Sequence, residues 1–151
     1  MKIGLGSDHN AFEYKVELKE FLESKGYEII DYGCYSAEEI DYPSVAFSVS
    51  EGVMQGAVDK AILVCGTGIG MAIAANKIKG IRAAQVNDIY SAERAALSNN
   101  AQIISFGSKV MGIEVIKKCA EEFLSLQFQG GNSGRKIDQI MEREDIVSKG
   151  V

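Results

Sequence analysis

KAILVCGTGIG, residues 60–70, joins an aliphatic run to a turn rich in glycine. The run Lys60–Cys65 predicts a strand, because a short continuous apolar segment bounded by glycine is typical of a strand buried on both faces. The turn Gly66–Gly70 contains three glycines and leads into a segment with helical spacing through Lys77. A buried strand followed by a glycine turn and a helix is the repeating unit of a parallel sheet. This stretch therefore predicts an α/β fold.

The same alternation of short apolar runs and longer helical segments extends along most of the chain. Gly26 ends the first helical segment, and Pro43 suits the first turn of another helix. Strands are expected over Lys2–Ser7, Tyr27–Tyr32, Lys60–Cys65, Arg82–Val86 and Gln102–Phe106. Helices are expected over Ala11–Lys25, from Asp41-Tyr42-Pro43 to about Gln55, over Ser91–Asn99 and over Ile113–Leu126. The pattern predicts a parallel sheet covered on both faces, with its ligand crevice at the carboxyl ends of the strands.

The last part of the sequence predicts a helical arm. Gln129–Gly134 is rich in glycine and is expected to interrupt the helical pattern, which resumes from Arg135 to about Ile146. We expect one domain over residues 1–151, with an arm from about residue 128 that packs on a partner subunit.

Composition narrows the classes of function. The chain has 151 residues, 16 Lys and Arg against 21 Asp and Glu, a net charge of −5 and 46% hydrophobic residues, as in a soluble globular domain. The absence of a Lys/Arg run argues against a nucleic-acid partner. No apolar stretch approaches the about 18 residues of a membrane span, and no signal peptide is expected. Cys34, Cys65 and Cys119 match no disulfide framework, and His9 is the only histidine. We therefore expect a reducing cytoplasm, no metal and no cofactor.

The glycine turn is the first candidate for chemistry. Its backbone N–H groups, at the start of a helix, can hold a phosphate or a developing oxyanion. A dinucleotide fingerprint would need glycine at Met71, and a P-loop would need Gly-Lys-Ser/Thr, so NAD and ATP sites are disfavoured. The alternative is a tight turn that binds no ligand.

Cys65 adds a reactive group to this turn. A thiol beside a helix N-terminus has its thiolate favoured and can act as a base or nucleophile, although free cysteine is also a common buried apolar residue. Cys34 and Cys119 are expected to be structural. Asp8 and His9 end the first strand and should share the same edge of the sheet. The alternative for this pair is a helix entry at His9 with Asp8 as its N-cap.

Five motifs, in order, give the chain a family resemblance. They are Gly6-Ser7-Asp8-His9, Asp41-Tyr42-Pro43, Cys65-Gly66-Thr67-Gly68-Ile69-Gly70, Ala74-Ala75-Asn76-Lys77 with Gly80-Ile81-Arg82-Ala83, and Phe106-Gly107-Ser108. Together they resemble the family of type B ribose-5-phosphate isomerases and galactose-6-phosphate isomerases. The resemblance implies a Rossmann-like three-layer α/β sandwich with five strands, assembled as a homodimer or a dimer of dimers. It also implies interconversion of aldose and ketose phosphates without a metal.

The resemblance assigns roles by position. Cys65 matches the base that moves a proton between C1 and C2, and Thr67 matches the hydroxyl that assists it. Some relatives use a glutamate at the position of Met71 instead. Asp8 matches a contact to a sugar hydroxyl, and His9 matches a contact to phosphate or substrate. The remaining substrate-binding positions are Tyr42, the loop residues Gly66, Gly68, Ile69 and Gly70, which stabilise the enediolate, and Asn99, which is reached across the dimer.

The chain departs from the family pattern around the substrate. Ser98 replaces the histidine that opens the furanose ring, and three arginines of the family fall at Lys109, Asn132 and Lys136. Arg135 is a candidate stand-in, shifted by one residue. Lysine keeps the charge but loses the bidentate fork of arginine.

These departures, with a likeness to the erythrulose 4-phosphate isomerase subgroup, favour a tetrose phosphate. Its C4 oxygen carries the phosphate, so it cannot close to a furanose and needs no ring-opening acid. D-erythrulose 4-phosphate and D-erythrose 4-phosphate are therefore the expected substrate pair. Ribose 5-phosphate is the alternative substrate, and a non-catalytic sugar-phosphate sensor is the alternative from another class.

Overall fold

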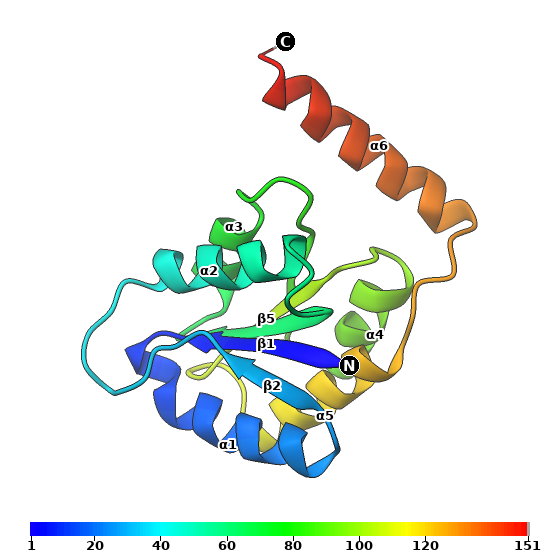
Figure 1. Cartoon of the computed structure of the whole chain (residues 1–151). Helices are drawn as coiled ribbons and strands as arrows, with labels where there is room; N and C mark the ends of the chain where they lie inside the picture. Colours follow the sequence, from blue (N-terminus) through cyan, green and yellow to red (C-terminus); the bar gives the residue numbers. More distant parts are fainter. Residues whose placement is uncertain (151) are drawn as a thin grey trace.

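The computed structural model describes residues 1–150 and contains one five-stranded sheet (Figure 1). The strands are β1 (Lys2–Ser7), β2 (Glu28–Asp31), β3 (Lys60–Cys65), β4 (Ala83–Gln85) and β5 (Ile103–Gly107). Their order is β2-β1-β3-β5-β4, and every neighbouring pair is parallel. Strand β2 lies on one side of β1, and the next strand along the chain, β3, lies on the other side of β1. The carboxyl ends of β1 and β3 therefore flank the point where binding crevices form in such sheets.

Helices cover both faces of this sheet. The helices α2 (Tyr42–Met54) and α3 (Ile69–Ala75) pack on one face, whereas α1 (Phe12–Ser24), α4 (Ile89–Leu97) and α5 (Ile113–Ser125) pack on the other. Alternate residues of β3 divide between the two layers: Ile62 and Val64 face the second group, and Leu63 and Cys65 face the first. The expected three-layer α/β sandwich is confirmed, and Cys65 points towards the layer of α2 and α3.

The chain after α5 differs from the sequence expectation. Helix α6 spans Asn132–Ser148, so Asn132, Ser133 and Gly134 are helical, and the prediction that they interrupt the helix is wrong. Gly130 and Gly131 have φ of 78° and 69°, which ends the preceding segment just before Asn132. Polar residues such as asparagine and serine are well tolerated at the start of a helix, and this outweighs the single glycine at 134.

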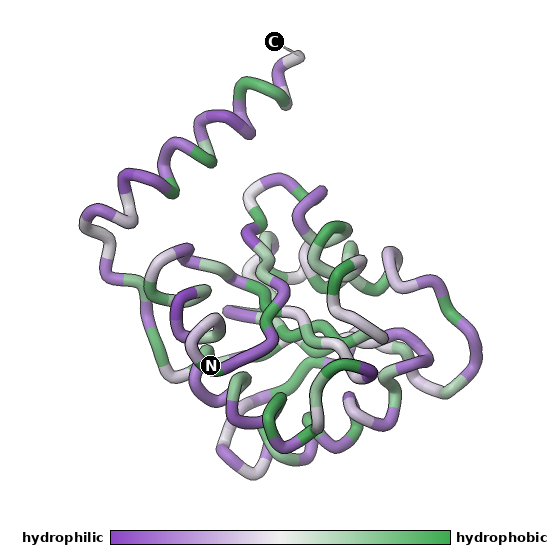
Figure 2. The backbone as a smooth tube through the Cα atoms, turned by 180° about the vertical axis from the view of Figure 1, so that it is seen from behind, coloured by the Kyte–Doolittle hydropathy of each residue, from purple (hydrophilic) through white to green (hydrophobic). Residues whose placement is uncertain are grey.

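Helix α6 lies outside the three layers of the fold in both views (Figures 1 and 2). Its only buried residue is Ile137, and apolar positions alternate with long hydrophilic stretches along it (Figure 2). Ile140, Ile146 and Val147 are exposed. None of the helices within residues 1–150 combines the length and the apolar character that a membrane crossing requires.

Candidate functional site

The thiol of Cys65 lies at the carboxyl end of β3, where the glycine loop begins. The residue is 5% exposed, and its Sγ accepts the backbone N–H of Gly68 at 3.1 Å. Thr67 Oγ1 accepts the N–H of Ile69 at 3.2 Å. The loop thus already directs two N–H groups at the two side chains expected to handle protons. A ligand oxyanion would share these donors rather than find them free, which the sequence alone does not indicate.

The loop is held against the end of β5. Gly68 has a φ of 78°, and a Cβ there would lie 2.8 Å from the carbonyl carbon of Phe106. The buried hydroxyl of Ser105 donates to the Gly68 carbonyl at 2.7 Å. A glycine is therefore required at position 68, both for its left-handed backbone and for the close approach of two main chains. Helix α3, which follows, ends at Ala75 rather than at the expected Lys77.

Asp8 and His9 follow β1 at the same edge. A short 3₁₀ turn, His9–Ala11, begins after Asp8, so the helix entry at His9 and the N-cap position of Asp8 are confirmed, although the Asp8 side chain makes no capping bond. Its Oδ2 accepts from Asn10 Nδ2 at 3.4 Å, whereas Oδ1 is buried without a hydrogen-bond partner in the described part of the chain. A buried carboxylate oxygen is usually hydrogen-bonded, and the hydroxyl of a bound sugar could donate to this one.

The imidazole of His9 is held by the loop before α2. Its Nδ1 lies 3.2 Å from the backbone nitrogen of Ile40 and 3.3 Å from the Ile40 carbonyl oxygen. The Ile40 carbonyl can only accept and would pair with Nδ1–H, whereas the Ile40 N–H can only donate and pairs with the tautomer that has Nδ1 as acceptor and its proton on Nε2. In that form Nε2–H is a donor suited to an anionic group.

Tyr42 and Lys109 complete this edge of the sheet. Tyr42 begins α2, and its ring lies against Gly70, where an added Cβ would come within 2.5 Å of it. The backbone N–H of Lys109 donates to the Gly66 carbonyl at 3.0 Å. The structure therefore gathers Asp8, His9, Tyr42, Lys109 and the whole loop at the carboxyl edge, and for Asp8, His9 and the loop this shared edge was expected from the order of elements.

Ser98 and Asn99 lie at the other edge of the sheet. Helix α4 begins after the carboxyl end of β4 and runs back towards the start of β5, so the two residues follow its C-terminus. The Ser98 hydroxyl accepts from Arg94 Nη1 at 3.3 Å, and the Arg94 guanidinium also pairs with Glu93 at 2.8 Å. Asn100, next along the chain, adopts the left-handed conformation with a φ of 46°.

The arm residues expected to bind substrate also lie away from the carboxyl edge of their own chain. Asn132, Arg135 and Lys136 are exposed and lie in the first turns of α6. The chain reaches α6 from the amino edge, where Lys60 Nζ donates to the carbonyls of Phe123 and Leu126 at 2.9 and 2.8 Å. Within one chain the structure therefore separates these residues, together with Ser98 and Asn99, from the cysteine.

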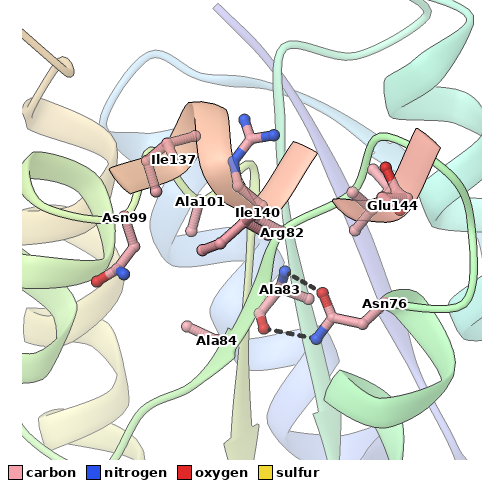
Figure 3. Close-up of a pocket in the computed structure, with 10 residues that line it drawn as sticks. Asn76, Arg82, Ala83, Ala84, Asn99, Ala101, Ile137, Ile140 and Glu144 are labelled. Atoms are coloured by element: carbon pink, nitrogen blue, oxygen red, sulfur yellow. Dashed lines mark hydrogen bonds between the residues drawn. The ribbon is translucent and has the colours of Figure 1, made fainter. Parts of the chain in front are cut away.

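A cavity of about 390 Å³ lies between α6 and the amino edge (Figure 3). Ile137, Ile140 and Glu144 line it from the helix. Burial lowers the pKa of the Arg82 guanidinium in its wall, and the charge of Glu144 opposes this effect. The sequence predicted no cavity here, although the spacing of residues 137, 140 and 144 places them on one helix face. The cavity wall also includes Asn76, Ile81, Ala83, Ala84, Asn99 and Ala101.

Polar contacts lie within this cavity wall and also connect the residues beside it to the arm. The side-chain amide of Asn76 exchanges two hydrogen bonds with the main chain of Ala83, both at 2.8 Å (Figure 3). Glu144 accepts the N–H of Gly80 at 2.9 Å, and Lys79 pairs with Asp145 at 2.7 Å. Within residues 1–150 no three acidic, histidine or cysteine side chains cluster in a way that could hold a metal ion.

Comparisons with known proteins find similarity over nearly the whole chain. The model of a family described as Ribose/Galactose Isomerase matches residues 3–140. The chain is 46% identical over 145 residues to a ribose-5-P isomerase B of Listeria innocua, covering 96% of this chain and 97% of that protein. It is 42% identical over 141 residues to a D-erythrulose-4-phosphate isomerase of Pectobacterium atrosepticum, covering 93% of each. A solved ribose-5-phosphate isomerase B of Clostridium thermocellum superposes with a TM-score of 0.95 at 40% identity, covering 97% of this chain and 99% of that one.

Proposed function

Because the chain belongs to the ribose/galactose isomerase family and is an aldose-ketose isomerase of sugar phosphates, we propose that it interconverts D-erythrulose 4-phosphate and D-erythrose 4-phosphate, with Cys65 as its base. The observation that carries the choice of substrate is Ser98. It stands at the position where the resemblance implies a ring-opening histidine, and its hydroxyl is already engaged by Arg94. A serine hydroxyl does not supply the acid that opening a furanose needs.

The proposed reaction moves one proton between adjacent carbons. The Cys65 thiolate removes a proton from C1 of the ketose, and the electron pair forms the C1–C2 double bond while the carbonyl oxygen becomes an oxyanion. The hydroxyl of Thr67 passes the proton of O1 to O2. The Cys65 thiol then returns its proton at C2, which leaves an aldehyde at C1. No net charge or electron is gained or lost.

The site geometry supports this division of roles. The N–H of Gly68 points at the Cys65 sulfur, and an N–H group so directed stabilises negative charge. The same loop supplies backbone dipoles next to the enediolate oxygens. The unpartnered Oδ1 of Asp8 can accept a sugar hydroxyl, and Nε2–H of His9 can donate to the phosphate.

We further propose that two chains share each site. Ser98, Asn99 and the start of α6 lie away from Cys65 within one chain, so they can contribute only to the Cys65 of a second copy. The exposed Ile140, Ile146 and Val147 give the arm an apolar surface for that copy. Arg135 and Lys136 then offer cations for a phosphate in the partner's site. The three buried free cysteines are consistent with a cytoplasmic enzyme.

Steady-state kinetics with both sugar phosphates tests the proposed substrate. We expect kcat/KM for D-erythrulose 4-phosphate to exceed that for ribose 5-phosphate by at least about tenfold, the effect of about 1.4 kcal/mol in transition-state stabilisation. A higher kcat/KM for ribose 5-phosphate would mean that the ring is opened without histidine, and the tetrose proposal would then be wrong. This alternative substrate is tested because one similar protein is named ribose-5-P isomerase B.

A further inference from the structure

Lys15 is a buried cation with no part in the chemistry described above. Its side chain is 1% exposed, and its Nζ lies 2.6 Å from Asp31 Oδ1. The ammonium also donates to the carbonyl of Cys34 and faces the rings of Phe12 and Tyr35, at 5.7 and 5.4 Å from their centroids. A buried charge destabilises the fold unless it is well paired. The Lys15 ammonium is compensated by one carboxylate, one carbonyl and two aromatic rings.

Apart from Phe12, which precedes it on α1, the partners of Lys15 lie at the end of β2 and in the chain that follows it. Asp31 Oδ1 also accepts the N–H of Gly33 at 2.8 Å, and the Tyr35 hydroxyl donates to the Asp31 carbonyl at 3.1 Å. One ammonium group therefore fixes the start of the loop that runs from β2 to α2.

This loop contacts the end of β1 at two places. At its start, the N–H of Ser7 donates to the Gly33 carbonyl and the N–H of Cys34 donates to the Ser7 carbonyl, each at 2.7 Å. At its end, the N–H of Ile40 donates to His9 Nδ1 at 3.2 Å. The loop therefore contacts the chain on both sides of Asp8. The Ile40 carbonyl lies 3.3 Å from the same ring nitrogen as the Ile40 N–H, so the position of the loop decides which of the two groups pairs with Nδ1.

We propose that Lys15 is a positioning residue of the active site, which holds the loop between β2 and α2 so that Ile40 keeps the His9 ring in the Nε2–H form. The consequence for binding rests on the proposed contact of His9 with the substrate. The effect on the ring itself does not, because it depends only on contacts within this chain. Lys15 thus acts through the loop and touches no reacting atom.

The test replaces Lys15 by methionine and observes the imidazole directly. His9 is the only histidine, so the imidazole ¹⁵N signals of tag-free protein belong to it without assignment. The wild type should show the Nε2–H form at alkaline pH, whereas Lys15→Met should show a mixture of both neutral forms. KM of the turned-over sugar phosphate should rise about fivefold, as for one lost hydrogen bond, with a smaller change in kcat.

Lys60→Met is the matched control. Lys60 also donates to two main-chain carbonyls and lies 4.4 Å from the centroid of an aromatic ring, that of Phe123, but at the amino edge of the sheet. It should leave the His9 signals and KM unchanged. If both variants alter the His9 signals equally, the effect is a general loosening of the fold and the proposal is overturned.

A second variant keeps the test decisive if Lys15→Met does not fold. Lys15→Met/Asp31→Asn removes both charges, so no unpaired carboxylate remains in the half-buried loop. This double variant should fold and show the same mixture of His9 forms. Folded variants with wild-type His9 signals would overturn the proposal. Altered signals with unchanged KM would keep the positioning role and instead remove His9 from substrate binding.

Discussion

Position in the fold distinguishes Cys65 from the other two cysteines. It ends β3 beside the glycine loop, and its sulfur accepts a backbone N–H at 3.1 Å. Cys119 lies buried in α5, where burial raises the pKa of its thiol to about 11. It is therefore protonated near neutral pH and is a poor nucleophile. Cys34 is buried in the loop after β2, with its sulfur 3.7 Å from the Ser7 hydroxyl.

Replacing Cys65 by alanine should abolish most of the turnover. We expect kcat to fall by about 10²–10⁴-fold, because that is the usual contribution of a positioned general base. Circular dichroism should be unchanged, since the side chain is small and lies at the end of a strand. Cys119→Ala serves as the control, with lower stability but a wild-type kcat. A Cys65→Ala enzyme with a wild-type kcat would contradict the role of the thiol.

Replacing Ser98 by histidine should broaden the substrate range. An imidazole at this position restores the acid that the family resemblance implies for ring opening, so kcat/KM for ribose 5-phosphate should rise about tenfold. The activity towards D-erythrulose 4-phosphate should rise much less, because that substrate has no ring to open. Ser125→His, on the exposed end of α5, controls for the added histidine. Equal gains for both sugars would count against the substrate argument.

At the scale of elements, the glycine loop depends on its contact with β5. Gly68→Ala adds a Cβ at a left-handed residue, 2.8 Å from the Phe106 main chain. The free energy of unfolding should fall by about 1–3 kcal/mol, and kcat should fall with it because the loop moves away from Cys65. Urea denaturation and kinetics measure the two effects. Gly112→Ala is the control, since its φ is −70° and no atom lies within 4 Å of the added Cβ.

The buried thiol of α5 predicts a dependence of stability on alkaline pH. The folded pKa of Cys119 lies above its ordinary value of 9.0, so the folded state binds the proton more tightly than the unfolded state. This contribution to stability is present in full below pH 9.0 and is lost as the pH rises towards about 11. Cys119→Val should unfold with a shallower pH dependence in this window. Identical slopes for wild type and variant would refute the prediction.

The elements were predictable where hydrophobic pattern and turn chemistry agree. The run before Gly66 and the glycines after it placed β3 and the loop correctly. The start of α6 was not predictable, because Gly130 and Gly131 end the preceding segment while Gly134 is accepted inside a helix. Local composition gives the same weight to all three glycines, whereas only their backbone angles separate them.

At the scale of the whole molecule, topology decides which candidate residues meet. The parallel sheet gathers Asp8, His9 and the Cys65 loop, because strand ends of one direction share an edge. Helix α4 connects the carboxyl end of β4 to the start of β5, so its C-terminus, with Ser98 and Asn99, lies at the opposite edge. The first set could therefore be predicted from the order of elements. The second set lies away from Cys65 within one chain, and its proposed place in a neighbouring site is not indicated by any periodicity within one sequence.

Mixing two inactive variants tests the shared site. Cys65→Ala removes the base from one set of chains, and Asn99→Ala removes the proposed contribution to the neighbouring site from the other set. Chains exchanged between the two should regenerate some intact sites, so activity should reappear with time after mixing. Each variant incubated alone controls for slow recovery. If the mixture stays inactive although the chains exchange, Asn99 does not act across the dimer.

¹H NMR in D₂O follows the proposed proton transfer between C1 and C2 of a short acyclic sugar phosphate. The protein is incubated with D-erythrulose 4-phosphate or, separately, with ribose 5-phosphate. We expect conversion of the tetrulose phosphate with deuterium appearing at its reacting carbons, and slower conversion of the pentose. The prediction is contradicted if the tetrulose phosphate shows no conversion and no exchange, or if ribose 5-phosphate is converted faster.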